Sequence, residues 1–270
     1  MIIYILVNNY LLIFTIYHLF YKGEIMFKSF IFYSKFLLDM VIQKPKTNEA
    51  RKKIAEFEAK GQIKEKYQYL HEISRNWTQG YVDLSGANIH VEGLENVPKD
   101  EPVLFVSNHQ GNFDILLLLT CIDKPKGFIA KKELSKIPTI GEWGNFIGCV
   151  FMDRDNLRKS AEAIIEGIKI LRQGQSMVIF PEGTRSKGGP MKEFKAGSFK
   201  LATKTKVPIV PITINGSYKV MDEKKFIIQK ADIDVYIHEP IITKSLTKEE
   251  EAELPKRVEN IVKSKLKTKI

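Results

Sequence analysis

The sequence predicts an α/β fold with a largely parallel central sheet flanked by helices, preceded by an amphipathic N-terminal two-helix segment that anchors the protein to a membrane. Three observations support this. Short apolar runs alternate with helical patterns along most of the chain, which is typical of crossover units in a parallel sheet. The 270 residues are 44% hydrophobic and 27% charged, a normal balance for a globular protein. Residues 1–43, in contrast, are rich in apolar and aromatic side chains.

Residues 1–21 and 25–43 are expected to form the two membrane-anchoring helices. The first stretch is mostly apolar and about long enough to cross a bilayer as a helix, although two asparagines and a histidine interrupt it. In the second stretch Lys28, Lys35 and Asp39 fall on one stripe at helical spacing, while Phe and Leu fill the remaining surface. This pattern favours a helix in the membrane interface over the alternative, a helix buried in the soluble core.

The start of the chain has a second interpretation. Residues 22–24, Lys-Gly-Glu, resemble a bacterial ribosome-binding site just upstream of Met26 if they are encoded by AAA-GGA-GAA. We therefore hypothesise that translation starts at Met26 and that residues 1–25 are not translated. Mass spectrometry of the native N-terminus tests this, and any peptide from residues 1–21 would contradict it.

Residues 44–80 predict a helical arm, broken near Gly61, that leads into an α/β domain at residues 81–270. The predicted strands of this domain are 89–91, 103–107, 127–130, 149–152, 177–180, 209–214 and 233–238. Residues 157–172 are the clearest helix, because their apolar side chains share one face. The stretch 246–270 predicts a pair of charged surface helices, the second starting at Pro255.

The net charge of +10 favours an anionic partner. Nucleic acid, an anionic membrane surface and an acidic carrier protein all have that charge. The lysines are spread along the chain and show no aromatic-basic pattern of an RNA-binding module, so we expect no nucleic-acid partner. Cys121 and Cys149 stand in apolar contexts without CxxC spacing, so neither a disulfide framework nor a zinc site is expected.

His109 and Asp114 follow the predicted strand 103–107, within the segment SNHQGNFD. Sites in parallel sheets gather where strands end. Asp114 can orient the imidazole and stabilise its charged form, which leaves the other ring nitrogen to take a proton from a substrate. An alternative stays open, in which Asn108 is a helix N-cap and His109 a polar first-turn residue. A metal site is not expected, because the other histidines offer no third ligand at a recognisable spacing.

Further polar residues follow other predicted strands. The segment after strand 177–180 carries four candidate binding residues, Glu182, Gly183, Thr184 and Arg185. Arg185 offers a planar fork to phosphate, Thr184 a hydroxyl, and Gly183 a backbone that a ligand can approach. The carboxylate of Glu182 can accept a hydrogen bond from a sugar or glycerol hydroxyl. Arg154 and the segment with Lys131 and Lys132 place further cations after strands, which suits a phosphorylated substrate with a nucleophilic hydroxyl.

Four segments in this order resemble the motifs of the glycerolipid acyltransferases. They are NHQGNFD at 108–114, VFMDR at 150–154, FPEGTRS at 180–186 and VPIVP at 207–211. Within that family the chain most resembles the bacterial 1-acyl-glycerol-3-phosphate acyltransferases, over about residues 85–240.

The resemblance implies transfer of a fatty acyl group from a thioester to the sn-2 hydroxyl of 1-acyl-sn-glycerol-3-phosphate, which gives phosphatidic acid. His109 would be the general base and Asp114 its support. Arg185 and a lysine, for which Lys131 is chosen over Lys132, would hold the phosphate. The glycerol-phosphate site would also be lined by Arg154, Glu182, Gly183 and Thr184.

The acyl donor would be acyl-CoA or acyl carrier protein, with no cofactor and no metal. The expected partners are lysophosphatidic acid, the anionic bilayer surface and that donor, and the expected location is the cytoplasmic face of the cell membrane, as a monotopic protein. Other readings stay open: an acyltransferase for glycerol-3-phosphate, another lysophospholipid or a lyso-ornithine lipid, or a noncatalytic protein that binds anionic lipid.

Overall fold

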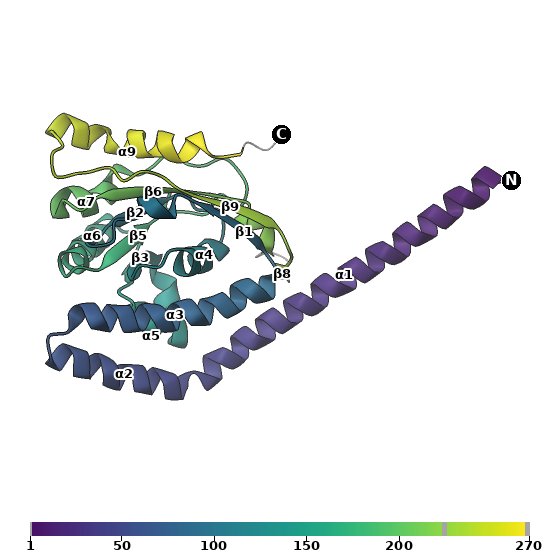
Figure 1. The fold of residues 1–270 in the computed structure, drawn as a ribbon, viewed down its shortest axis with the longest axis horizontal. Helices are drawn as coiled ribbons and strands as arrows, with labels where there is room; N and C mark the ends of the chain where they lie inside the picture. The colour runs from purple at the N-terminus through teal and green to yellow at the C-terminus, as the bar shows by residue number, and fades with distance from the viewer. Residues whose placement is uncertain (1, 223–225, 268–270) are drawn as a thin grey trace.

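The computed structural model describes residues 2–222 and 226–267, with side chains from residue 22 onward except that of Asp222. At its centre lies a seven-stranded sheet in the order β1-β9-β6-β2-β5-β3-β4 (Figure 1). Neighbouring strands are parallel except β6 and β9, which are antiparallel. The strands are β1 (Asn88–Glu92), β2 (Leu104–Ser107), β3 (Lys126–Lys131), β4 (Val150–Met152), β5 (Ser176–Ile179), β6 (Ile209–Asn215) and β9 (Asp232–Ile237). The predicted α/β fold with a largely parallel sheet is confirmed.

Helices cover both faces of this sheet, with α3 and α4 on one face and α6, α7 and α9 on the other (Figure 1). The helices are α1 (Ile2–Ile42), α2 (Lys44–Ala59), α3 (Ile63–Ser85), α4 (Phe113–Cys121), α5 (Pro138–Phe146), α6 (Leu157–Arg172), α7 (Lys200–Thr205), α8 (Ser217–Val220) and α9 (Lys248–Ser264). Short 3₁₀ turns occur at Leu94–Asn96, Lys132–Lys136 and Ala196–Phe199. A small antiparallel hairpin is formed by β7 (Met221–Asp222) and β8 (Ile227–Ile228).

The central strand β2 is fixed between two hydrophobic cores. Phe105 packs with Phe113 and Leu117 of α4, whereas Leu104 and Val106 belong to the core under α6, α7 and α9. Successive strand residues point to opposite faces, so both faces of β2 are buried. The carboxyl end of β2 is therefore a rigid support for the residues that follow it.

Several predicted elements are confirmed. The helix at residues 157–172 is α6, and the break near Gly61 separates α2 from α3, because Gly61 has a φ of +68°. Helix α3 continues past residue 80 to Ser85 and packs against α4. Helices α5 and α7 and the β7–β8 hairpin were not predicted.

Two predictions were wrong. Residues 1–43 do not form two helices, because α1 runs without a break from Ile2 to Ile42; one interior glycine, Gly23, costs only about 1 kcal/mol and does not end a helix. Residues 246–270 do not form a helix pair either, because Pro255 lies inside the single helix α9. Buried Leu254 and Val258 on either side of it keep the helix packed on the sheet.

The C-terminal half of α1 docks on α3 through Asp39. This carboxylate is 5% exposed and accepts hydrogen bonds from Lys35 Nζ (2.7 Å), Trp77 Nε1 (2.9 Å) and Tyr81 OH (2.6 Å). Burial alone would raise the pKa of Asp39, but these three donors outweigh it and hold the pKa below its ordinary value. The polar stripe predicted for this helix therefore faces the protein.

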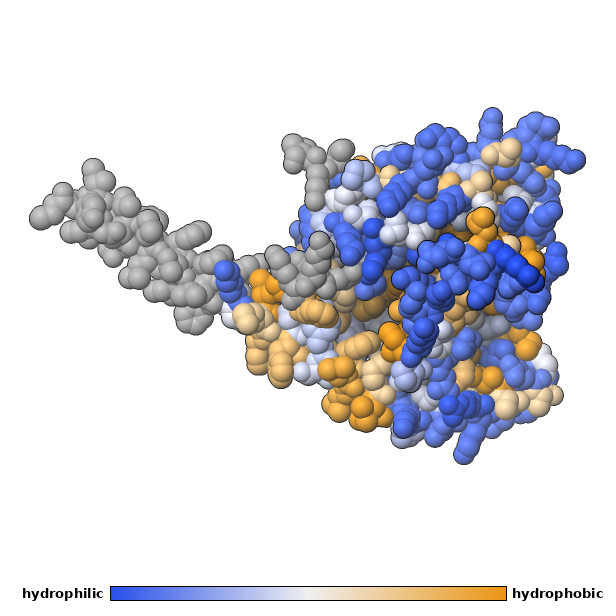
Figure 2. Space-filling view, turned by 180° about the vertical axis from the view of Figure 1, so that it is seen from behind, coloured by the Kyte–Doolittle hydropathy of each residue, from blue (hydrophilic) through white to orange (hydrophobic). Residues whose placement is uncertain are grey.

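The opposite face of α1 is exposed and apolar (Figure 2). Its exposed side chains are Met26, Phe27, Phe30, Ile31, Leu37, Leu38, Val41 and Ile42. Among residues whose side chains are described, no helix is long and apolar enough to cross a membrane. The apolar stretch at residues 1–21, which was predicted to be about long enough to cross a bilayer, lies outside the residues whose side chains are described.

Candidate active site

His109 and Asp114 form a direct hydrogen-bonded pair just beyond the carboxyl end of β2. His109 Nδ1 lies 2.7 Å from Asp114 Oδ2. The same oxygen accepts the backbone N–H groups of Gln110 (2.7 Å) and Gly111 (3.0 Å), so the chain turns around the carboxylate before α4 begins. Asp114 is fully buried and His109 is 8% exposed. The pair therefore has the geometry of a base with its orienting carboxylate, with ring Nε2 on the side away from the carboxylate.

The alternative that made Asn108 a helix N-cap is wrong. The residue before α4 is Asn112, and it makes no side-chain cap hydrogen bond. Asn108 instead pairs with the backbone of β6, since its Nδ2 donates to Ile214 O (2.9 Å) and its Oδ1 accepts from Ile214 N (2.8 Å). This amide ties the turn that carries His109 to the neighbouring strand β6.

A phenylalanine from the next motif fixes the plane of the imidazole. Phe180 stacks on His109 with ring centroids 4.0 Å apart and an interplanar angle of 16°. Phe180 directly follows β5, so this contact brings the segments 108–114 and 180–186 side by side at one edge of the sheet. Stacking and the bond to Asp114 together leave the ring little rotational freedom.

Glu182 supports this edge of the sheet through hydrogen bonds to the backbone of two segments. Its Oε1 accepts the backbone N–H of His109 (2.7 Å) and its Oε2 that of Lys192 (2.9 Å), and the side chain is only 3% exposed. Burial raises the pKa of Glu182, against the lowering effect of the two N–H donors. The carboxylate thus joins the His109 turn to the loop that carries Lys192. Its contact with a glycerol hydroxyl stays a prediction.

Two arginines gather beside this loop. Arg154 Nη1 donates to Gly183 O (2.7 Å), and Arg185 Nη1 donates to Asn112 Oδ1 (2.6 Å). Burial, with a smaller effect from the positive charge of Arg185, lowers the pKa of Arg154. Two guanidinium groups held near each other in a half-buried place favour a bound anion such as phosphate. Gly183 has a φ of +69°, which suits glycine in the turn that brings this carbonyl to Arg154.

The remaining predicted residues are less tightly placed. Thr184 is half-buried next to Gly183. Lys131 ends β3 in register with Met152, which places it at the same sheet edge as Arg154, but it is exposed and pairs with Glu133 at 3.4 Å. The neighbouring Lys132 instead binds Asp153 (2.7 Å). Register, and not a contact with the arginines, therefore supports the choice of Lys131.

Sequence reasoning missed Ser217 and the role of Gln110. Ser217 Oγ donates a hydrogen bond to Asp114 Oδ1, and Gln110 Oε1 accepts the backbone N–H of Gly216 (2.8 Å). The available signal was the position of Ser217 just after the predicted strand 209–214, at the edge where His109 was expected. Among the described residues, no three His, Cys, Asp or Glu side chains converge as a metal site.

An apolar cavity of about 230 Å³ lies on the α4 side of the sheet. Ile115 and Leu116, which directly follow Asp114, form part of its wall. Trp77 of α3, Phe151 of β4 and Phe36 of α1 line other parts of it. The cavity therefore extends from the helix that carries Asp114 to the docked end of α1.

Comparison with known proteins places this site in context. Residues 88–215 match the family model described as Acyltransferase. A 1-acyl-sn-glycerol-3-phosphate acyltransferase of Borreliella burgdorferi is 35% identical over 187 residues, which are 68% of this chain and 74% of that protein. A chloroplastic 1-acyl-sn-glycerol-3-phosphate acyltransferase of Arabidopsis thaliana is 41% identical over 155 residues, 57% of this chain and 43% of that protein. The match thus spans less than half of this plant relative.

The fold has a solved counterpart. The crystal structure of the 1-acyl-sn-glycerophosphate acyltransferase from Thermotoga maritima superposes with a TM-score of 0.75 at 30% sequence identity. The superposition covers 90% of this chain and 95% of that one. The likeness therefore extends over most of this chain.

Proposed function

This chain belongs to the family of the 1-acyl-sn-glycerol-3-phosphate acyltransferases, and from that premise we propose that it acylates the sn-2 hydroxyl of 1-acyl-sn-glycerol-3-phosphate to give phosphatidic acid. The observation that carries the proposal is the 2.7 Å bond between His109 Nδ1 and Asp114 Oδ2 at the carboxyl edge of the sheet. A binding-only protein would have no need of a base oriented in this way.

The reaction follows from what the pair can do. His109 Nε2 takes the proton of the sn-2 hydroxyl while the oxygen attacks the thioester carbonyl, and Asp114 stabilises the imidazolium that forms. The new C–O bond replaces the C–S bond, and the imidazolium returns the proton to the departing thiolate. A thioester is already activated, so orientation and proton removal supply most of what the reaction lacks.

Arg154 and Arg185 are the proposed phosphate site, with Lys131 at its margin. The support is the hydrogen bonds of Arg154 to Gly183 and of Arg185 to Asn112. These bonds place both guanidinium groups beside the segments 108–114 and 180–186, the first of which carries His109. A guanidinium can bind two phosphate oxygens at once, which would set the distance between the phosphate and the reacting hydroxyl. Thr184 and Gly183 stand in the same turn, where the backbone can approach a ligand closely.

The apolar cavity beside α4 is proposed to hold an acyl chain. Its walls are almost entirely hydrophobic, and they begin at the residues next to Asp114. It reaches Phe36 of α1, the helix whose outer face is apolar. We propose that this outer face lies in the membrane interface on the cytoplasmic side, so that the acceptor enters from the bilayer. Acyl-CoA and acyl carrier protein are both proposed donors, with no cofactor.

The test is an acyl-transfer assay with purified protein in mixed vesicles. Lysophosphatidic acid, glycerol-3-phosphate, another lysophospholipid and a lyso-ornithine lipid are offered in turn, each with both thioester donors. We expect turnover with lysophosphatidic acid, and the His109→Ala variant should lose about 10²- to 10⁴-fold in rate while it binds vesicles like the wild type. Preference for another acceptor would reassign the substrate, and full turnover by the variant would reject the base.

A further inference from the structure

Asp114 is held by hydrogen bonds on both of its oxygens. Oδ2 faces His109 and two backbone N–H groups, whereas Oδ1 accepts a hydrogen bond from Ser217 Oγ. Ser217 is fully buried. Its hydroxyl also lies 3.3 Å from Gln110 Oε1, so both of its side-chain partners belong to the segment 108–114 that carries His109.

The position of this hydroxyl is itself fixed. Gly216 adopts a φ of +93°, and a Cβ added there would lie 2.3 Å from Asp232 O, so the chain must be glycine at this point. The Gly216 N–H donates to Gln110 Oε1 (2.8 Å), which ties the start of α8 to the turn after β2. Ser217 is therefore not free to move away from Asp114.

The segment after Ser217 is held from the other side by α1. Helix α8 leads into β7, which pairs with β8. In β8, Ile228 is fully buried against Phe32 of α1 and Tyr81 of α3, and its N–H donates to Ser29 Oγ (2.8 Å). The hydroxyl on Asp114 thus belongs to a short element fixed both to the catalytic turn and to the docked helix.

We propose that Ser217 is a positioning residue for the His109–Asp114 pair, an inference that rests on the proposed acyl transfer. Its hydrogen bond to Oδ1 acts together with the two backbone N–H bonds to Oδ2 against rotation of the carboxylate about its Cβ–Cγ bond, which keeps Oδ2 directed at the ring nitrogen. A carboxylate free to turn would spend part of its time without that bond, and the imidazolium formed in the reaction would then lose its stabilising partner. Ser217 acts through Asp114 and does not touch the substrate.

Other buried serines in the protein show what a purely structural role looks like. Ser85 is also fully buried, but its Oγ donates to the carbonyl of Val82 (2.6 Å) at the end of its own helix. Such bonds satisfy local backbone geometry and involve no catalytic group. Ser85→Ala is therefore a matched control for Ser217→Ala, with the same atom removed from an equally buried site.

The experiment compares Ser217→Ala, Ser217→Thr and Ser217→Val with the wild type and Ser85→Ala. We expect Ser217→Ala to lower kcat by about tenfold or more with little change in KM for the lysophospholipid, because the acceptor site is untouched. Thr keeps the hydroxyl and Val has nearly the same shape without it, so Thr should restore most of kcat and Val should not. Wild-type kcat in Ser217→Ala, or equal losses in Thr and Val, would overturn the proposal.

A second readout does not depend on turnover. The proton between His109 Nδ1 and Asp114 Oδ2 is expected to give a low-field ¹H NMR resonance, identified by its absence in His109→Ala. That resonance should shift or exchange faster in Ser217→Ala and Ser217→Val, and stay in place in Ser217→Thr and Ser85→Ala. A resonance that ignores Ser217 would reject the positioning role. If the wild type shows no acyl transfer, the proposed function fails, and this resonance still decides whether Ser217 positions the pair.

Discussion

Replacing Glu182 by glutamine tests whether this carboxylate supports the backbone of the site or contacts the substrate. The carboxylate accepts the backbone N–H groups of His109 at 2.7 Å and Lys192 at 2.9 Å. A glutamine can keep one of these bonds, but its NH₂ group must then face the other N–H donor. Hydrogen bonds to a charged group contribute about 1.5–3 kcal/mol each and neutral ones about 1 kcal/mol. After allowance for the burial cost that the neutral side chain avoids, we expect a loss of about 2 kcal/mol, or a fall in Tm of roughly 5 °C.

The kinetic consequence should appear in kcat. Loss of the longer bond, to Lys192, would free the loop, and loss of the other would loosen the backbone of the base itself. A small misplacement of a catalytic group can cost on the order of 10²-fold in rate. We expect Glu182→Gln to reduce kcat by at least tenfold. Steady-state kinetics at saturating donor and thermal unfolding monitored by circular dichroism measure the two effects.

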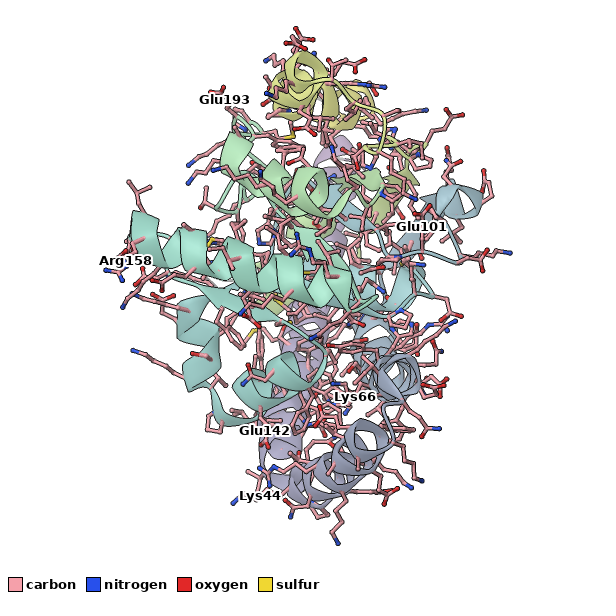
Figure 3. The ribbon with its side chains drawn as sticks, turned by 90° about the vertical axis from the view of Figure 1, so that its left-hand side faces the viewer. Lys44, Lys66, Glu101, Glu142, Arg158 and Glu193 are labelled. Carbon is pink, nitrogen blue, oxygen red and sulfur yellow. The ribbon has the colours of Figure 1, made fainter. Side chains whose placement is uncertain are left out.

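Glu193→Gln is the matched control, because this exposed side chain of the same loop points outward (Figure 3). It should leave both Tm and kcat unchanged. If Glu182→Gln instead keeps the wild-type Tm and raises only the KM for the acceptor, then the carboxylate binds the glycerol hydroxyl and the bracing argument is wrong.

Two further predictions follow from the charges. Arg185→Ala should raise the KM for lysophosphatidic acid by roughly tenfold or more through loss of a charge-assisted phosphate bond, whereas Arg158→Ala, on the outer end of α6 (Figure 3), should not; equal effects would reject the phosphate site. Because the folded state lowers the pKa of Asp39, its contribution to docking of α1 is complete above the unfolded value of 3.8 and is lost as pH falls through the lower folded pKa. Hydrogen exchange of residues 26–42 should therefore accelerate below about pH 4 in the wild type. The Asp39→Asn variant, which lacks the charge, should exchange fast at neutral pH. Identical exchange profiles for the two proteins would count against the role of Asp39 in docking α1.

The sheet and the pairing of His109 with Asp114 could be predicted because their signals are local. Apolar runs bounded by turns mark the strands, and parallel strands bring their carboxyl ends to one edge, which is enough to expect His109 near Arg154 and Arg185. The role of Ser217 was missed, because its partner Asp114 is 103 positions away and its one signal, a place just after a strand at the same sheet edge, does not identify a partner. The bracing role of Glu182 was missed for a related reason: its partners are backbone N–H groups, which every sequence has.

The two errors in helix boundaries, at opposite ends of the chain, have a different physical cause. The charged tripeptide Lys-Gly-Glu at residues 22–24 looks like a break between two helices. None of its residues lacks a backbone N–H donor, so α1 continues through it. Pro255 does remove a backbone donor, and α9 still continues. Burial of the apolar residues around Pro255 against the sheet stabilises the helix by more than the lost hydrogen bond destabilises it. Packing that depends on distant residues decided the outcome in α9 and is not visible in a local window.

The outward face of α1 is apolar, whereas the outward face of a surface helix in a soluble protein is polar. Such a helix buries its apolar stripe and exposes its charges. Here Asp39 and Ser29 point inward to α3 and β8, while Phe27 and Phe30 are more than 60% exposed. An exposed apolar strip of this kind is unfavourable in water and favourable in a membrane interface. The inward polar contacts also hold the helix in a fixed position relative to the cavity and, through β8 and α8, to Ser217. The same helix that would meet the bilayer is thus fastened to the element that orients Asp114, which links the proposed membrane position of the protein to the geometry of its base.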